Sequence, residues 1–519
     1  PTSLSNSYSS LETIFDPESE MYLPKLRYVA THSPQKEVDL SANITYTEPV
    51  SKHSQVSVQY RFDVENQEIA KNSYLTGSDY DITGLSPLPE ISRLTQNRSA
   101  EHRIGPGFRY SKDRNTFIAN VYYQYSELDG YVDYSFVNRK FNNVTYFVMG
   151  NVAFNAQNTI RVFINSYTHN PDIVNLQPIY DVSNAQFVTR GNGGLKSSYN
   201  HRVNFHYVRS NIEKGRTFMW MFSLQNQQNY ISSATLYCPT GFELSRFGDN
   251  VTVPTNSKGE NYRPQRITSY ENMDGYWNMR THVSFGLPLS FMKCNLNLSA
   301  GVNYSIIPSA IYNNVGQDVV QNILDHNFTT NFAKNIGYNA NVTLGSNISE
   351  NIDFTLSWHG TYNQAWNTAS KAGAKNDYFN HVASGTLKWV FWKGFTFTAA
   401  ASYNQYIGIT QDYNEQYVLC NLFLGKKVFK NQRGEIQIGV NDIANQNTAF
   451  SRTTGSGYTK NMTNSVIGRY YSIQFVYNLR HFGKRGSKQM SDYDYRESKS
   501  SVGMGAGNGG MRMGPMMRR

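Results

Sequence analysis

Along most of this chain, segments of about ten residues alternate apolar and polar side chains. In the segment 55–64 the apolar positions are Val56, Val58, Tyr60, Phe62 and Val64. The same alternation runs through 295–304, 352–359 and 471–480. Because successive side chains of a strand point to opposite faces, each segment predicts a strand with one apolar and one polar face. Roughly nine to eleven residues is also the length that a tilted strand needs to cross a bilayer.

The connections between these segments alternate short and long. Short turns are expected near 49–53, 113, 155–158, 211–214, 289–293, 345–350, 392–394 and 427–433. Long links are expected at 65–100, 127–143, 169–197, 230–270, 307–326, 365–376 and 443–467. Bacterial outer-membrane barrels have short periplasmic turns and long extracellular loops, which produce this rhythm. A propeller or solenoid would instead repeat a motif at a fixed period, and the sequence has no such repeat.

The composition favours the same architecture. An apolar fraction of 39% and a mean hydropathy of −0.54 are too low for one packed core scaled to 519 residues. No apolar run approaches the roughly 18 residues of a membrane-spanning helix. A barrel needs only a thin outer apolar band, and its aromatic girdles account for 38 tyrosines. We therefore predict an all-β fold, a large antiparallel transmembrane β-barrel in the bacterial outer membrane. A large soluble β-sandwich or jelly roll is the alternative.

The pattern gives about seventeen strands, the last at 468–482, whereas single-chain bacterial barrels have an even number. We therefore expect the N-terminal part of the barrel to be missing, unless a weak strand within 21–31 restores an even count. Residues 1–10 have neither the basic start nor the apolar stretch of a signal peptide, which a mature protein would have lost. The expected organisation is a leading segment or extracellular loop at 1–37, the barrel at 38–482 and a tail at 483–519.

Three stretches of the sequence carry a family resemblance: 39–64, 161–207 and the C-terminal end of the predicted barrel, 434–482. The middle stretch has a pattern of N-P, then L-x-P, then G-N before a strand, with Asn170, Pro171, Leu176, Pro178, Gly191, Asn192, Leu195 and Lys196. Gly193, Ser197 and Ser198 depart from that pattern, which has Pro at the first position and Pro-Glu at the other two. Together these stretches resemble the TonB-dependent-receptor-like outer-membrane β-barrel family of Bacteroidetes.

The resemblance implies a twenty-two-stranded barrel with an N-terminal plug and a TonB box, of which this chain shows the C-terminal barrel portion. It implies a receptor or transporter that imports an unidentified ligand. We expect no enzymatic activity, with an outer-membrane phospholipase or protease as the minor alternative. The implied partners are outer-membrane lipid and lipopolysaccharide, the barrel-assembly machinery, and TonB if the missing part carries a TonB box. A structural or assembly barrel of an outer-membrane complex and a passive porin are the alternative functions.

The last predicted strand and the tail after it have separate expectations. Gly468, Tyr471, Phe475, Tyr477 and Phe482 resemble the C-terminal signal that the barrel-assembly machinery reads. The tail, 483–519, is rich in Gly, Ser and Met and lacks periodicity, so we expect it to be disordered. It holds eight Lys/Arg against three Asp/Glu, half of the net charge of +10, so the basic balance does not indicate nucleic-acid binding.

Little else in the sequence points to chemistry. Cys238, Cys294 and Cys420 are widely spaced and form no C-x-x-C, so we interpret them as incidental, with a disulfide as the alternative. The eleven histidines have no metal-binding spacing, and no nucleophile elbow is present. We therefore expect no catalytic, cofactor-binding or metal-binding residues. The ligand-binding residues stay unassigned, because Tyr-, Asn- and Ser-rich loops can bind many ligands.

Overall fold

The computed structural model describes residues 2–477 with gaps at 17–20, 78, 90–91, 134, 178, 183–185, 240, 248–260, 313–326, 347–348, 350, 369–376, 409–413, 430–431, 448, 456–457 and 465–466. Strands dominate it, and 22 of them join in one sheet. None of the helices in the described residues is long and apolar enough to cross a membrane. Residue 482 of the predicted assembly signal and the predicted tail, 483–519, lie outside the described residues.

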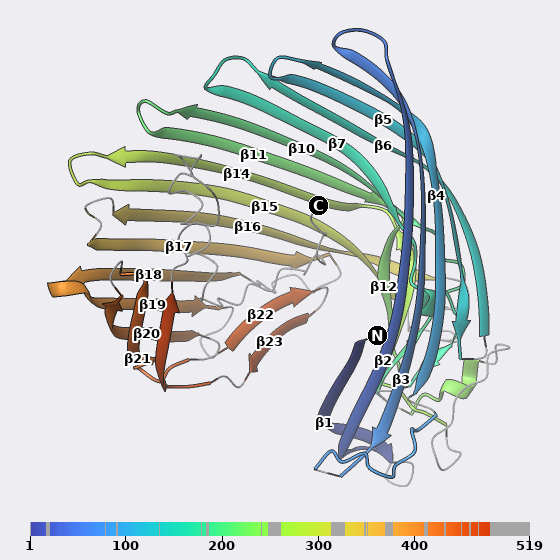
Figure 1. Ribbon diagram of the computed structural model, residues 1–519. Coiled ribbons are helices and arrows are strands. Elements are labelled where there is room, and N and C mark those ends of the chain that lie inside the picture. The colour runs from blue at the N-terminus through green and yellow to red at the C-terminus, as the bar shows by residue number, and fades with distance from the viewer. Residues whose placement is uncertain are drawn as a thin grey trace.

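Eighteen of these strands pair antiparallel in one series, which we call the wall. In order they are β1 (Thr2–Asp16), β2 (Met21–Pro49), β3 (Ser54–Leu75), β4 (Arg93–Lys112), β5 (Asn115–Val132), β6 (Ser135–Ala153), β7 (Asn158–His169), β10 (Ser198–Asn211), β11 (Arg216–Gln228), β14 (Tyr276–Leu289), β15 (Cys294–Tyr312), β16 (Phe328–Ser346), β17 (Ile352–Asn367), β18 (Tyr378–Phe391), β19 (Phe395–Ile407), β20 (Glu415–Val428), β21 (Gly434–Asn441) and β24 (Tyr470–Tyr477). The wall curls around a wide interior (Figure 1).

The wall is open along one line in the part of the chain that the structure describes. β1 begins opposite Gln35, halfway along β2, so residues 36–49 of β2 pair only with β3. At the other edge β24 pairs only with β21, and no described pairing joins it to β1 or β2. The antiparallel all-β architecture predicted from the alternation is confirmed, and the described strands leave a seam between its two edges.

In the described residues the wall has eighteen strands, whereas we predicted about seventeen. β1 and the first part of β2 occupy residues 1–37, where we expected a leading segment or loop, and the weak strand considered within 21–31 is the start of β2. The alternation of apolar and polar residues did not predict β1, because its sequence, TSLSNSYSSLETIFD, is rich in serine and has few apolar residues. The ladder of backbone hydrogen bonds with β2 does not depend on an apolar face.

Two of the predicted long links are shorter than expected. Residues 65–75 and 93–100 are the ends of β3 and β4, which leaves a link at 76–92, and residues 127–132 and 135–143 are strand in β5 and β6. Strands of 18–29 residues therefore extend well past the length that crosses a bilayer. A paired strand with water on both sides needs hydrogen bonds but no apolar face, so polar sequence continues these hairpins. The strand ends that the predicted short turns connect all lie on one edge of the wall, which we call the short-turn rim (Figure 1).

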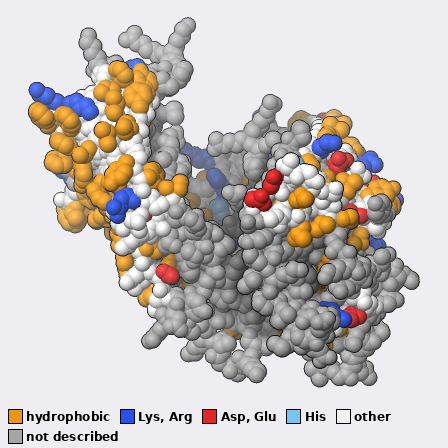
Figure 2. All heavy atoms as spheres, turned by 90° about the horizontal axis from the view of Figure 1, so that it is seen from below, with side chains coloured by type: hydrophobic (Ala, Val, Ile, Leu, Met, Phe, Trp, Pro, Cys, Tyr) orange, Lys and Arg blue, Asp and Glu red, His pale blue; other side chains and the backbone are white. Residues whose placement is uncertain are grey.

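The two faces of the wall differ in chemistry. On the outward face, large apolar side chains oppose one another from strand to strand: Val342 lies opposite Trp358, Trp220 opposite Val283, and Ile436 opposite Phe475. These side chains are well exposed in the isolated chain. Figure 2 shows hydrophobic side chains gathered on the outer flanks of the molecule. The opposite face carries polar and charged side chains, as the alternation predicted.

Two of the predicted long links fold into a unit of their own, the loop module, at the edge of the wall opposite the short-turn rim. Its elements are α1 (Ile173–Leu176), β8 (Tyr180–Asp181), β9 (Phe187–Arg190), β12 (Tyr230–Tyr237), η1 (Leu244–Phe247) and β13 (Arg266–Met273). β9 pairs in parallel with β13, and β12 pairs in parallel with β15 of the wall. A separate hairpin, β22 (Ala449–Gly455) with β23 (Tyr458–Asn464), lies in the last long link, and η2 (Trp392–Gly394) forms a short turn.

The wall itself provides the opening that the loop module fills. The pairing of β6 with β7 stops at Phe147 opposite Asn165. Beyond that point β6 still pairs with β5 and β7 still pairs with β10, so the two halves of the wall separate. The Tyr199 hydroxyl of β10 bridges the gap by donating to the Val144 carbonyl oxygen of β6.

A charge on the outward face should weaken the barrel more than a charge on the inner face. We expect Val342→Arg to destabilise the folded chain in lipid by about 2–4 kcal/mol if it lies near the membrane centre, because the guanidinium would face hydrocarbon. Asn341→Arg, one residue away on the polar face, is the matched control and should cost far less. Urea unfolding in lipid vesicles measures both, and equal destabilisation would contradict the assignment of the faces.

Candidate functional site

The polar face of β3, β4 and β5 carries charged side chains in two adjacent rows. In one row Asp63 lies opposite Glu101, and in the next row Arg61 lies opposite Arg103. Like charges directly opposite each other destabilise a sheet. Each charge here is instead paired along its own strand, two residues away on the same face, which balances both rows.

These ion pairs have close geometry. Arg61 Nε and Nη2 donate to the two carboxylate oxygens of Asp63 at 2.6 and 2.9 Å. Arg103 Nη2 donates to Glu101 Oε1 at 2.5 Å. The Arg61–Asp63 pair is forked, and charge-assisted hydrogen bonds like those of both pairs are shorter and stronger than neutral ones. Four formal charges on one face exclude lipid from it and indicate that it lines an aqueous interior.

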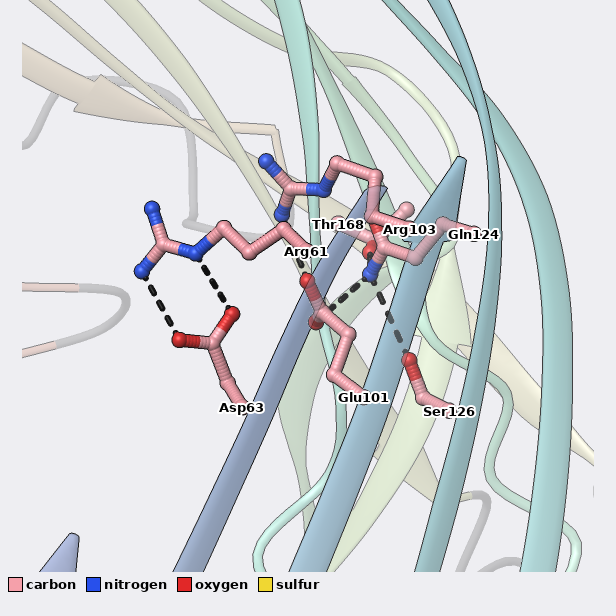
Figure 3. Close-up of polar contacts among 7 residues, drawn as sticks. All are labelled: Arg61, Asp63, Glu101, Arg103, Gln124, Ser126 and Thr168. Carbon is pink, nitrogen blue, oxygen red and sulfur yellow. Dashed lines mark hydrogen bonds and ion pairs between the residues drawn. The ribbon is translucent and has the colours of Figure 1, made fainter. Parts of the chain in front are cut away.

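Gln124 of β5 connects this cluster to β7, across the gap between β6 and β7. Its side-chain amide donates to Glu101 Oε2 at 2.8 Å, to Thr168 Oγ1 at 2.9 Å and to Ser126 Oγ at 3.3 Å. Gln124 is only 2% exposed. Figure 3 shows the seven residues, which we call the inner-wall network: Arg61, Asp63, Glu101, Arg103, Gln124, Ser126 and Thr168. The network makes the wall polar beside the opening between β6 and β7.

A second polar strip lies on the same face of β7, β10 and β11. Arg202 Nη2 donates to Gln225 Oε1 at 3.1 Å, and Gln225 Nε2 donates to Asn200 Oδ1 at 2.9 Å. The Arg202 guanidinium also lies 5.8 Å from the centre of the Tyr167 ring, within the range of a cation–π contact. The inner face therefore presents donors, acceptors and aromatic rings, which suit polar ligands without specifying one.

Three exposed carboxylates, Glu37, Asp39 and Glu65, also gather on the inner face, with oxygens within 4.8 Å of one another. Asp39 lies directly opposite Glu65, and Gln35 Nε2 donates to Glu37 at 3.2 Å. Exposed acidic groups also gather on proteins without binding an ion, so the cluster alone does not make a metal site.

The family-motif residues predicted from the sequence lie where the loop module meets the wall. Asn170 Oδ1 accepts a hydrogen bond from Ser197 Oγ at 2.6 Å, next to the buried Pro171. Asn192 donates from its backbone to the Asn175 carbonyl at 2.6 Å and from its side chain to the Tyr270 carbonyl at 2.8 Å. These hydrogen bonds tie the first half of the module to its second half and to the start of β10.

Gly191 and Leu195 of the same motif act through packing. A Cβ atom at Gly191 would lie 1.9 Å from the Gln177 carbonyl oxygen, so only glycine fits there. Leu195 is buried against Leu128 of β5 and Leu176 of α1. The rest of the module has its own apolar core, with Val188, Leu236, Phe242, Leu244 and Ile267 almost fully buried.

Charge and burial secure the module further. The Arg93 guanidinium of β4 lies 3.8 Å from the Asp133 carboxylate and 3.6 Å from the Asp181 carboxylate, so it joins the wall to β8.

The three cysteines are free thiols. Burial in the module raises the pKa of Cys238 to about 12, so this thiol is almost wholly protonated at neutral pH.

The residues of the predicted assembly signal lie at the edge of the wall. Tyr471, Phe475 and Tyr477 project from the outward face of β24 and are exposed, and Gly468 precedes the strand. Their recognition by the assembly machinery stays a prediction. The sequence analysis did not identify Gln124 and Thr168. A glutamine or a threonine within a strand does not indicate which side chain it will bond.

Gly191→Ala should loosen the loop module, because the added methyl group overlaps the Gln177 carbonyl. We expect a loss of about 1–3 kcal/mol in local stability, the usual cost of overpacking. Limited proteolysis with mass mapping should then show faster cleavage within 170–197. Gly150→Ala is the matched control, because no atom lies within 4 Å of its added methyl group. Equal cleavage of the two variants would contradict this role of Gly191.

Comparison with known proteins supports the architecture. Residues 313–477, about a third of the chain, match the model of the outer membrane protein beta-barrel family. No curated protein matches the sequence.

Solved structures of several receptors and transporters align with most of the chain. The copper transporter OprC aligns at 9% identity and a TM-score of 0.37, over 85% of this chain and 69% of that one. The siderophore receptor PiuA from Acinetobacter baumannii gives 9% identity and a TM-score of 0.35, over 91% and 71%. The ferric enterobactin receptor PfeA from Pseudomonas aeruginosa, as an R480A mutant, gives 10% and 0.31, over 91% and 81%. With TM-scores this low, the structural similarity gives no information about the function of this chain.

The name of the matching family refers to the outer membrane and to a β-barrel, and it does not refer to an enzymatic activity. The match falls on the end of the wall, where β16 to β21 and β24 continue the antiparallel series that begins at β1. The two-faced wall is the form that crosses a bacterial outer membrane. This chain is an outer-membrane protein built on a β-barrel wall.

Proposed function

We propose that this chain forms the barrel of an outer-membrane transporter that imports a ligand not yet identified. The observation that carries the proposal is the inner-wall network, which places four paired charges on the enclosed face of a wall whose outward face is apolar. A wall of eighteen strands is wide enough to leave a water-filled interior. A polar path through an apolar membrane is what import requires.

The resemblance to TonB-dependent receptors supports an energised form of import, in which TonB and an upstream plug act with this barrel. Lipopolysaccharide and the barrel-assembly machinery are further partners in this proposal, the latter through Tyr471, Phe475 and Tyr477 of β24. The motif of Asn170, Pro171, Gly191, Asn192 and Leu195 is proposed as the anchor of the loop module.

Uptake by living cells tests the function. Cells with and without the gene would be offered labelled iron chelates, copper, peptides and oligosaccharides, before and after collapse of the proton gradient. The proposal expects uptake of one class to require both the gene and the gradient. Uptake that needs the gene but not the gradient would identify a passive porin. If no uptake depends on the gene and the chain co-purifies in a stable complex, it is an assembly barrel.

The inner-wall network should set the ion preference of the interior. We expect the pair Asp63→Asn and Glu101→Gln to shift conductance toward chloride, because Arg61 and Arg103 then lack their counter-charges. The reversal potential of the purified chain in a planar bilayer under a KCl gradient measures the shift.

The control for this measurement removes an acid from the other face. Glu68 pairs with Lys36 at 3.5 Å, and the strand register places both on the outward side. Glu68→Gln should therefore leave the reversal potential unchanged. A shift as large as that of the inner pair would show that the network does not face the conducting interior.

A further inference from the structure

The turns of the short-turn rim carry apolar side chains at their tips. Ile212 is 89% exposed, Phe291 81%, Trp392 70% and Phe154 66%. Turns that face water are usually built from Gly, Asn, Asp, Ser and Pro. Isolated apolar residues are normal on a protein surface, but here they recur at the tips of four separate turns on one edge of the wall. The rim is therefore suited to an environment less polar than water.

Basic residues accompany these apolar tips. Across the turns 50–53, 112–114, 154–157, 212–216, 290–293 and 392–394, the cations are Lys52, Lys112, Arg114, Lys214, Arg216, Lys293 and Lys393. All seven are exposed, and the same turns hold only two acids, Asp113 and Glu213. None of the seven has an ion-pair partner among the described residues. These six turns of the rim thus carry an excess of positive charge, which favours an anionic partner.

The turn between β18 and β19 shows how charge and apolar surface combine. The Trp392 ring stacks on the Phe395 ring, with centroids 5.6 Å apart and an angle of 8°. Lys426 Nζ lies 4.1 Å from the centre of the Phe395 ring and donates to the Lys393 carbonyl at 2.6 Å. Lys393 Nζ lies 5.8 Å from the Trp392 ring. Two ammonium groups are therefore held beside a pair of aromatic rings at the edge of the outward apolar band.

We propose that the short-turn rim binds the phosphate groups of anionic glycerophospholipids. Long basic side chains keep their methylene stems on apolar surface and their charge at the headgroups. Aromatic rings favour the same interfacial depth. The apolar tips enter the acyl region, and the cations between them hold the phosphates. Short turns of bacterial barrels lie on the periplasmic side, so the lipids belong to the inner leaflet.

A lipid occupant fits better than a protein partner. The tips and cations are distributed over six turns along one edge, at the ends of strands whose outward side chains are apolar. A headgroup layer meets such an edge along its whole length and has the opposite charge. The inference requires the chain to lie in the outer membrane but does not depend on the proposed transport.

Lipid retention tests the proposal. The full chain in mild detergent would be mixed with equal amounts of phosphatidylglycerol and phosphatidylcholine, and bound lipid counted by native mass spectrometry. We expect a preference for phosphatidylglycerol that weakens as salt is raised. Lys393→Gln together with Lys426→Gln should lower retention of phosphatidylglycerol, by roughly fivefold for each cation removed. Retention of phosphatidylcholine should change little.

Controls separate this reading from others. Lys36→Gln removes an exposed lysine far from the rim and should not alter retention. Inorganic phosphate at millimolar concentration should not displace the lipid, because it lacks the acyl chains that the tips contact. Equal retention of both lipids, an equal loss in Lys36→Gln, or full displacement by phosphate would each overturn the proposal. If the double variant fails to fold, Lys52→Gln with Lys112→Gln tests the rim at two other turns.

Discussion

The need to satisfy every backbone hydrogen bond without water is the constraint on which this structure depends. In lipid an unpaired N–H or C=O group costs several kcal/mol, so a strand can cross only as part of a paired wall. Seventeen antiparallel pairings meet this condition for almost the whole wall. Once the strands are paired, the period-two alternation puts lipid-facing groups on one side and water-facing groups on the other. The chemistry of both faces follows from the pairing.

On the enclosed face, charge has to be balanced locally. Register places Asp63 opposite Glu101 and Arg61 opposite Arg103, which would be unfavourable if each residue faced only its cross-strand neighbour. Pairing along each strand resolves the conflict, and Gln124 then links Glu101 to Thr168 across the gap in the wall. The inner-wall network is thus a consequence of register as much as of composition.

The loop module packs at the gap between β6 and β7, where the two halves of the wall separate. The module supplies its own core and a second contact around Leu128, Leu176 and Leu195, and Gly191 permits the close approach of its backbone. A region that the sequence presents as two long polar links holds most of the buried apolar residues that the structure describes.

The sequence by itself determined the strands with an apolar face, the short turns and the outward band, because these depend on a period of two that is visible locally. It also contained the basic and apolar turn tips, which lie within a few residues of one another. Only the tertiary structure decided the strand β1, the extension of β3 to β6 past the membrane, the loop module and the partners of Gln124. Each of these rests on pairing or packing between segments far apart in the chain, and alternation carries no information about which segments meet.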